Sequence, residues 1–430
     1  MIVSADWVLP IEGEPIADGA VVVEDGRIAA VGPAAELGEG ERFEDSVVVP
    51  GFVNAHSHLE YAVYAGFGDG LDFAEWILVH IERKARIGWE EHVANARAGA
   101  AECLRSGITT VGDASFSGAA AVACAELGLR ALVYLEVFGG PEQLATRFEP
   151  ARKRITPFLS DRVRLGISPH APYSVTPELY AACLELGLPV ATHLAESEDE
   201  HRWLTSGTGP WERFADALPP PLGTTGIRHL AARGTLSPRV TAAHCVTVDD
   251  DELALLAASD VAVAHCPRSN ALLGCGVAPL AALRGAGLRV GLGTDSPASA
   301  VSFDMFDELR AAVLGERARA RRADALTGAE ALELATLGSA RALGLDGEVG
   351  SLIPGKRADL TVVSLAGSTW LPWEDAATAV VLGGSPDRVR LTLVDGEARY
   401  RHGDTQWHAL TAAARDARRR LLAPAASTPR

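Results

Sequence analysis

Two histidines separated by one residue follow an apolar run near the start of the chain. Residues 46–60 read SVVVPGFVNAHSHLE, and the imidazoles belong to His56 and His58. Because residues two apart on a strand point to the same face, both rings could bind one metal ion. The pattern therefore predicts a strand that brings two metal ligands to its C-terminal end.

Further short apolar runs alternate with helical patterns along the middle of the chain. Together with the run that ends at His56, the predicted strands are 108–114, 130–138, 163–168, 189–196, 239–245, 261–266 and 289–295. Near-continuous apolar strands separated by amphipathic helices predict a parallel sheet covered by helices. Eight such units favour a closed (β/α)8 barrel. A doubly wound sheet is the alternative, but it would normally show a Gly-rich fingerprint after the first strand.

Six of the twelve histidines and two acids lie at or just after the C-terminal ends of these strands. They are His56, His58, His170, His193, Glu196, His244, His265 and Asp295. In a barrel, such strand ends converge on one site whatever their distance in sequence. Three imidazoles and one carboxylate, from His56, His58, His193 and Asp295, suit a divalent metal with an open position for water. We expect one such ion per chain, with Zn²⁺ favoured and Fe²⁺ as the alternative.

The remaining side chains at the strand ends suggest acid–base roles. Asp295 could contact the metal and also accept a proton from the water, whose pKa a metal lowers towards about 7. His244 could orient that water or polarise the substrate. Glu196 could carry a proton to a substrate nitrogen; its alternative role is that of an acid stabilised by the dipole at the start of a helix.

The two ends of the chain differ from the middle. Residues 1–45 and 347–403 contain short alternating segments with Asp-Gly pairs at hairpin positions. We predict that residues 1–48 and 347–403 form a small β-sandwich domain and that residues 49–346 form the barrel. Residues 404–430 are expected to form a C-terminal helix and tail.

Composition limits the partners. The net charge is −17, from 56 acidic and 39 basic residues, which argues against nucleic acid or an anionic membrane surface as partner. Six cysteines without CxxC spacing indicate a reducing compartment. With no leader pattern and no long apolar run, we expect a cytoplasmic protein with a small-molecule substrate. The oligomeric state is left open, with a homodimer as one option.

Taken together, the motifs resemble the amidohydrolase superfamily, and most closely its cytosine-deaminase-like branch. They are PGFVNAHSH, THLAESEDE, AAHC, AHCPRSNALLG, GLGTDSPAS and GSLIPGKRADLTVV. The resemblance implies the metal ligands named above, Glu196 as proton donor to a ring nitrogen, and His244 and Asp295 acting on the water. Some members bind two metals bridged by a carbamylated lysine after the fourth strand. GISPHAPYS has no lysine there, so the resemblance implies a mononuclear hydrolytic deaminase.

The substrate pocket also resembles that of adenosyl-type deaminases, which implies an aminopurine nucleoside as substrate. GISPHAPYSVTPELY implies that His170 contacts the nucleoside, and LDFAEWILVHIER implies that Trp76 lines the pocket and that Glu82 binds ribose hydroxyls. The spacing between Trp76 and Glu82 is shorter than in adenosylhomocysteine deaminases. The arginines that those enzymes use on the amino-acid carboxylate have no clear counterparts.

This departure favours a sister group, the 6-aminodeoxyfutalosine deaminases of the alternative menaquinone pathway, whose substrate carries a benzoate-like arm. Arg268 is the first candidate for binding that arm and Arg202 the second, although either could be a structural arginine. His265 is assigned to the same pocket, and residues 201–223 are predicted to form a lid. The alternatives are deaminases of adenosylhomocysteine, methylthioadenosine or guanine, a triazine chlorohydrolase, and an inactive metal-binding scaffold.

Overall fold

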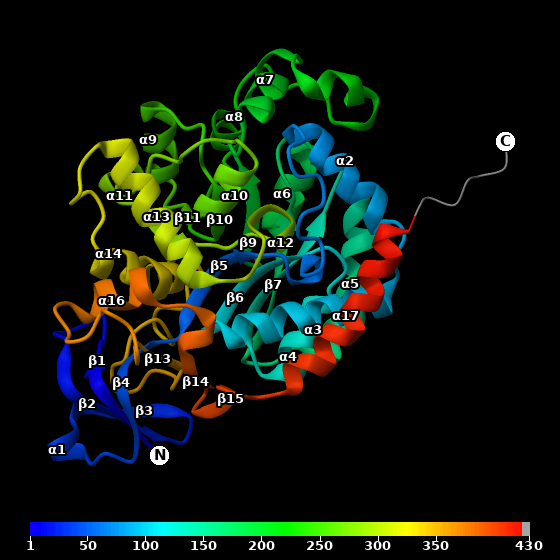
Figure 1. Ribbon diagram of the computed structural model, residues 1–430. Helices are drawn as coiled ribbons and strands as arrows, with labels where there is room; N and C mark the ends of the chain where they lie inside the picture. Colours follow the sequence, from blue (N-terminus) through cyan, green and yellow to red (C-terminus); the bar gives the residue numbers. More distant parts are fainter. Residues whose placement is uncertain (424–430) are drawn as a thin grey trace.

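The computed structural model describes residues 1–423 and contains two β-sheets with helices around the larger one (Figure 1). The larger sheet has eight parallel strands in sequential order, each hydrogen-bonded to the next. Its strands are β5 (Phe52–Ser57), β6 (Ile108–Ser115), β7 (Arg130–Val137), β8 (Val163–Pro169), β9 (Val190–Leu194), β10 (Val240–His244), β11 (Ala262–His265) and β12 (Arg289–Leu292). This arrangement confirms the predicted barrel.

The barrel strands are apolar because both of their faces are covered. Every residue of β5, β6 and β7 is buried, as expected for a parallel sheet enclosed by helices. The helices that follow the strands are α2 (Phe73–Lys84), α3 (Trp89–Arg105), α4 (Ala119–Leu127), α5 (Glu149–Ile155), α6 (Pro177–Glu185), α7 (Glu198–Ser206), α8 (Gly226–Ala232), α9 (Asp250–Ala258), α10 (Pro267–Leu272), α11 (Leu280–Gly285), α12 (Pro297–Ala300), α13 (Met305–Ala320), α14 (Gly328–Glu333) and α15 (Ser339–Ala342).

The first and last barrel strands meet at the C-terminal mouth of the barrel. The backbone N–H of Asp295 donates to the carbonyl of His56 at 2.9 Å. Just before these two residues in the chain, the side-chain amide of Asn54 donates to the hydroxyl of Thr294 at 2.7 Å and accepts from the backbone N–H of Thr294 at 2.9 Å. Gly293 permits this approach, because a Cβ there would lie 2.8 Å from the Cβ of His56. The closure therefore fixes two strand ends that carry predicted metal ligands.

The smaller sheet is built from both ends of the chain, as predicted. Its seven strands are, in spatial order, β15 (Glu397–Arg401), β14 (Val389–Val394), β13 (Leu360–Ser364), β4 (Glu41–Pro50), β1 (Ile2–Val8), β2 (Ile16–Glu24) and β3 (Arg27–Pro33). β13 pairs antiparallel with β4 and thereby joins the two ends. The sheet has its own apolar cluster, which includes Val3, Val21, Leu360 and Leu391. The predicted boundary near residue 48 falls within β4.

A C-terminal helix, α17 (Gln406–Leu422), lies against the barrel on the side of α3 (Figure 1). Leu421 is buried together with Tyr64 and Phe67 from the loop that follows β5. The guanidinium of Arg418 donates to the carbonyl of Ala65 at 3.0 Å. The helix thus supports the first loop of the barrel mouth. The predicted tail beyond residue 423 lies outside the described residues, within which no helix is long and apolar enough to cross a membrane.

Candidate active site

The four predicted metal ligands converge at the mouth of the barrel. His58 Nε2 lies 3.3 Å from His193 Nε2 and 3.4 Å from Asp295 Oδ1. His56 Nε2 lies 3.7 Å from the same carboxylate oxygen. All four side chains are buried, and His56 Nε2 has no hydrogen-bond partner within the described part of the chain. Closely spaced, buried imidazole and carboxylate donors with an unpaired nitrogen fit a divalent transition metal.

The protein holds the opposite atoms of these side chains in place. His193 Nδ1 lies 2.9 Å from the carbonyl oxygen of His170, so it donates there and leaves Nε2 as the free donor atom. Asp295 Oδ2 accepts from the hydroxyls of Ser269 and Ser299, each at 2.7 Å. These contacts orient Asp295 so that its Oδ1 faces the imidazoles.

Burial also sets the protonation states of this donor cluster, which consists of His56, His58, His193 and Asp295. Burial lowers the pKa of His56 and His193, and it lowers the pKa of His58 to about 3. Burial raises the pKa of Asp295, but the neighbouring imidazoles, His58 foremost, lower it by more, so that it ends below its usual value. The cluster therefore offers neutral imidazoles and an ionised carboxylate, which are the forms that bind metals.

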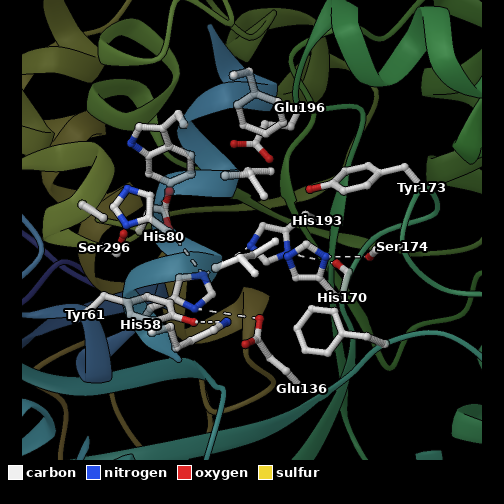
Figure 2. A pocket seen from close by; sticks show the side chains of 18 of the residues that line it. His58, Tyr61, His80, Glu136, His170, Tyr173, Ser174, His193, Glu196 and Ser296 are labelled. Carbon is white, nitrogen blue, oxygen red and sulfur yellow. Dashed lines mark hydrogen bonds and ion pairs between the residues drawn. The ribbon is translucent and has the colours of Figure 1, made fainter. Parts of the chain in front are cut away.

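Glu196 lies beside the donor cluster and projects into the same cavity (Figure 2). Its Oε1 is 3.6 Å from His244 Nε2. Burial raises the pKa of Glu196 to about 8, against the opposing effect of His193. The carboxyl group is therefore protonated at neutral pH and can act as an acid.

Local backbone geometry places Glu196 in front of a helix rather than within it. Helix α7 is capped by the Ser197 side chain, and its own first-turn acids are Glu198, Asp199 and Glu200. The carboxylate of Glu200 accepts from the backbone N–H of Ala195 at 3.2 Å and of Glu196 at 2.8 Å. The acids of the first turn thus provide the negative charge that stabilises the N-terminus of the helix, and the side chain of Glu196 is free to face the cavity.

Several residues at the strand ends have positive φ angles, which are uncommon for residues other than glycine. They are Ala195 (53°), His244 (76°), Cys245 (47°) and Asp295 (55°). Such backbone conformations cost energy and concentrate at functional sites. At His244, the ring is further held by a 2.9 Å contact between Nδ1 and Asn270 Oδ1.

A cavity of about 180 Å³ opens next to the donor cluster (Figure 2). Its wall includes His58, His193 and Asp295 as well as Glu196. Half of the remaining lining residues are aromatic, and Trp76 and His170, both predicted to contact the substrate, are among them. The other aromatic residues are Tyr61, Phe73, His80, Phe138, Tyr173 and Trp211. The cavity can accommodate a flat, largely apolar molecule.

The family model of the amidohydrolases matches residues 47–399, which cover the whole barrel. The chain belongs to the amidohydrolase family. A second model, an imidazolonepropionase-like composite domain of bacteria, matches residues 19–39. The amidohydrolase assignment confirms the predicted superfamily and the prediction of an enzyme.

Two curated relatives span nearly all of this amidohydrolase. A 5-methylthioadenosine/S-adenosylhomocysteine deaminase of Symbiobacterium thermophilum is 33% identical over 420 residues, covering 93% of each chain. A 5'-deoxyadenosine deaminase of Methanothermobacter thermautotrophicus is 32% identical over 402 residues, covering 90% of each.

Solved structures show the same fold. An adenosine deaminase from Xanthomonas campestris with bound zinc superposes with a TM-score of 0.87 at 29% identity, covering 98% of each chain. An atrazine chlorohydrolase from Arthrobacter aurescens, complexed with zinc, has a TM-score of 0.83 at 23% identity, covering 97% of this chain and 99% of the other. At that identity, the chlorohydrolase supports the fold alone.

Three side chains assigned to the substrate of the amidohydrolase lie outside the cavity. Glu82 is exposed on α2 and pairs with Arg86. It points away from the cavity because the residues of α2 that line the cavity repeat every three to four positions, and Glu82 falls between them. Arg268 is held by Glu308 and by the carbonyl of Ser302, to which it donates at 2.8 Å. His265 is buried but does not reach the cavity. These three assignments are corrected, and the second arginine candidate, Arg202, is exposed and also absent from the lining.

The predicted lid contributes two side chains to the cavity wall. Trp211 and Leu218 line the cavity, and the ring of Trp211 lies 4.7 Å from that of Tyr173. The 3₁₀ segment η4 (Pro210–Ala217) is linked to α2 through Arg213, which donates to Glu75 at 2.9 Å. Residues 201–223 therefore cover part of the site.

Sequence reasoning missed two charged residues that line the cavity, Glu136 and Lys84. Glu136 lies near the C-terminal end of β7, after the run Ala131–Leu135. An acid at that end of a barrel strand was the signal that could have identified it. Burial raises the pKa of Glu136 to about 7 and lowers that of Lys84 to about 8, and each charge partly offsets the shift of the other. Lys84 ends α2, and its helical register with Trp76 and His80 could have placed it on the cavity side.

Proposed function

We propose that this amidohydrolase is a metal-dependent deaminase of an adenine nucleoside. In the overall reaction, water replaces the amino group at C6 of the purine, and ammonia is released. The observation that carries the proposal is the buried carboxyl group of Glu196, which faces the cavity beside the donor cluster. A deaminase needs such an acid, because the ring nitrogen must gain a proton as oxygen adds to the neighbouring carbon. Relatives named as deaminases of adenine nucleosides support this choice.

The donor cluster fits one divalent ion, which we propose to be zinc, with His56, His58, His193 and Asp295 as ligands. When bound, the ion supplies a Lewis acid that lowers the pKa of water at the site. The serine hydroxyls on Asp295 Oδ2 and the backbone carbonyl on His193 hold the ligands in register before any ion arrives.

The protein's own side chains then move the protons. Asp295 accepts a proton from the attacking water, and Glu196 donates its proton to the purine nitrogen next to C6. His244, fixed by Asn270, directs its Nε2 to the place where water and Glu196 meet. The proton held by Asp295 passes to the departing amine, which leaves as ammonia. As ammonia leaves, the oxygen on C6 gives its remaining proton to Glu196, which restores the acid. Water and nucleoside thus become the 6-oxopurine nucleoside and ammonia, with every proton accounted for.

We further propose 6-aminodeoxyfutalosine as the specific substrate. The aromatic lining of the cavity supports this narrower proposal, because Phe138, Tyr173 and Trp211 can pack against an aryl arm. Arg268 cannot bind the carboxylate of that arm, because its guanidinium is engaged by Glu308 and Ser302. The narrower proposal therefore depends on packing rather than on an arginine contact.

A substrate panel tests both levels of the proposal. Metal-replete protein is mixed with adenosine, 5'-deoxyadenosine, 5'-methylthioadenosine, S-adenosylhomocysteine, 6-aminodeoxyfutalosine and guanine, and ammonia release is measured. We expect release from the adenine nucleosides, with the highest kcat/KM for 6-aminodeoxyfutalosine. If none of the adenine nucleosides reacts, the deaminase proposal is wrong. A higher kcat/KM for another adenine nucleoside would contradict only the narrower one.

A further inference from the structure

One wall of the cavity carries two charged side chains that the mechanism does not use, the buried Glu136 and the half-buried Lys84. Glu136 comes from β7 and Lys84 from the last turn of α2, and both line the cavity. In the view of Figure 2, Glu136 and Glu196 lie on opposite sides of His193. Glu136 therefore lines a part of the cavity that is separate from the carboxyl group of Glu196.

The hydrogen-bonding capacity of this pair is largely unused. Lys84 Nζ donates to the hydroxyl of Tyr61 at 3.1 Å and lies 3.6 Å from the ring centroid of Phe116, which leaves two of its three donors free. Within residues 1–423 the carboxylate of Glu136 accepts no hydrogen bond, and its approach to His58 Nδ1, at 4.0 Å, is too long to be one. Buried charges are costly unless they are paired and hydrogen-bonded, so both groups are poised for a ligand in the cavity.

No other cation satisfies Glu136 in the described chain. Arg147 is close by, but its Nε donates to the main-chain carbonyl of Glu136 at 2.9 Å and its Nη2 to the carbonyl of Phe116 at 2.7 Å. Lys84 and Glu136 form no direct ion pair among the described residues, although they share the wall. A group between them must therefore donate towards the carboxylate and accept from the ammonium. A hydroxyl does both, whereas an anion would be repelled by Glu136.

We propose that Glu136 and Lys84 bind the vicinal hydroxyls of the substrate's ribose. The two hydroxyls donate to the two oxygens of Glu136, and Lys84 donates to one hydroxyl oxygen. This assignment rests on the proposed deaminase function and adds its sugar specificity: the enzyme selects ribonucleosides over deoxyribonucleosides. It also places the sugar-binding acid on β7, in place of the exposed Glu82.

The test compares adenosine with 2'-deoxyadenosine and 3'-deoxyadenosine. A hydrogen bond to a charged group corresponds to about a tenfold to hundredfold preference, so wild-type kcat/KM should fall by that factor when either hydroxyl is removed. In the variants Glu136→Gln and Lys84→Met, the preference for adenosine should shrink to within about threefold, while metal content stays as in the wild type. Glu82→Gln, an exposed acid on the same helix as Lys84, serves as the matched control and should keep the full preference.

The substrate comparison in the wild type needs no variant, so a misfolded variant does not leave the proposal untested. Equal kcat/KM for adenosine and both deoxynucleosides would overturn it. So would Glu136→Gln lowering kcat/KM equally for all three substrates, because that result assigns Glu136 to the positioning of His58. If the wild type deaminates none of them or of the other adenine nucleosides, the deaminase function itself fails, and that outcome is distinct from a loss of sugar selectivity.

Discussion

The donor cluster and the wall formed by Glu136 and Lys84 face the same cavity but differ in how the protein satisfies their polar atoms. In the cluster, Asp295 has two serine donors behind it and His193 has a backbone carbonyl. On the wall, Glu136 accepts no side-chain hydrogen bond in residues 1–423, and Lys84 has only the hydroxyl of Tyr61. The difference is what we expect if the cluster holds its ligand atoms rigid before an ion binds, and if the wall, as proposed, keeps its hydrogen-bonding capacity free for a sugar.

The largest effect is expected where the cluster loses a charge. Asp295→Ala removes a ligand and the group that accepts the proton from water, so ammonia release should become undetectable and the metal content per chain should fall. Elemental analysis and an ammonia assay measure both. Asp251→Ala, at an exposed acid, should leave both unchanged. Full activity in the Asp295→Ala variant would remove Asp295 from the mechanism.

Loss of the buried acid should spare the cluster. Glu196→Gln keeps the shape of the side chain but cannot supply a proton of suitable acidity, so kcat should drop by about 10²–10⁴-fold. The metal content should stay at the wild-type level, and Glu198→Gln, an exposed neighbour in α7, should behave as wild type. A Glu196→Gln variant with normal turnover would contradict the role of Glu196 as the proton donor.

The contacts behind the cluster should have a smaller effect. Ser299→Ala removes one of the two hydroxyls that orient Asp295, and losing such a contact typically costs about 10–100-fold in metal affinity or activity. Titration with a competing chelator measures the affinity. The exposed Ser206 provides the control, as Ser206→Ala should change nothing. An unaltered metal affinity in the Ser299→Ala variant would show that Ser269 alone holds Asp295.

The pH profile tests the protonation state of Glu196. Burial raises the pKa of Glu196 to about 8, so its acid form is dominant below that value and is lost above it. If this acid donates the proton, kcat/KM should be level near neutral pH and fall by about tenfold for each pH unit above about 8. A rate that keeps rising beyond pH 9 would mean that Glu196 acts as a base or not at all.

The smallest effect is expected at the outer edge of the cavity. Arg213 joins the segment above the site to Asp72 and Glu75, but this contact is exposed to solvent. Exposed ion pairs contribute little, so Arg213→Ala should raise KM by only a few-fold and leave kcat unchanged. A large loss of kcat would instead show that closure of residues 201–223 limits turnover.

The barrel and the convergence of the strand ends were predictable because each rests on a local pattern. Each apolar strand can be recognised without knowledge of its neighbours. Since every strand of a parallel barrel brings its C-terminal residues to one mouth, the residues at these ends can be placed together. His193 and Asp295 are 102 positions apart in sequence, yet each needed only its own strand end to be placed. The substrate wall was predicted less well, because Trp76 and Glu82 were assigned from a resemblance in sequence. Trp76 lines the cavity, but Glu82 is exposed.

The sequence by itself thus determined the fold, the strand-end residues that meet in the donor cluster, and the place of the acid after β9. Only the tertiary structure decided which face of α2 meets the cavity, and it selected Lys84 over Glu82 because packing sets the rotation of a helix. It also decided that Arg268 is structural, since its partner Glu308 lies 40 residues further along the chain. Contacts of that kind depend on how separate elements pack together, and no local pattern of residues encodes them.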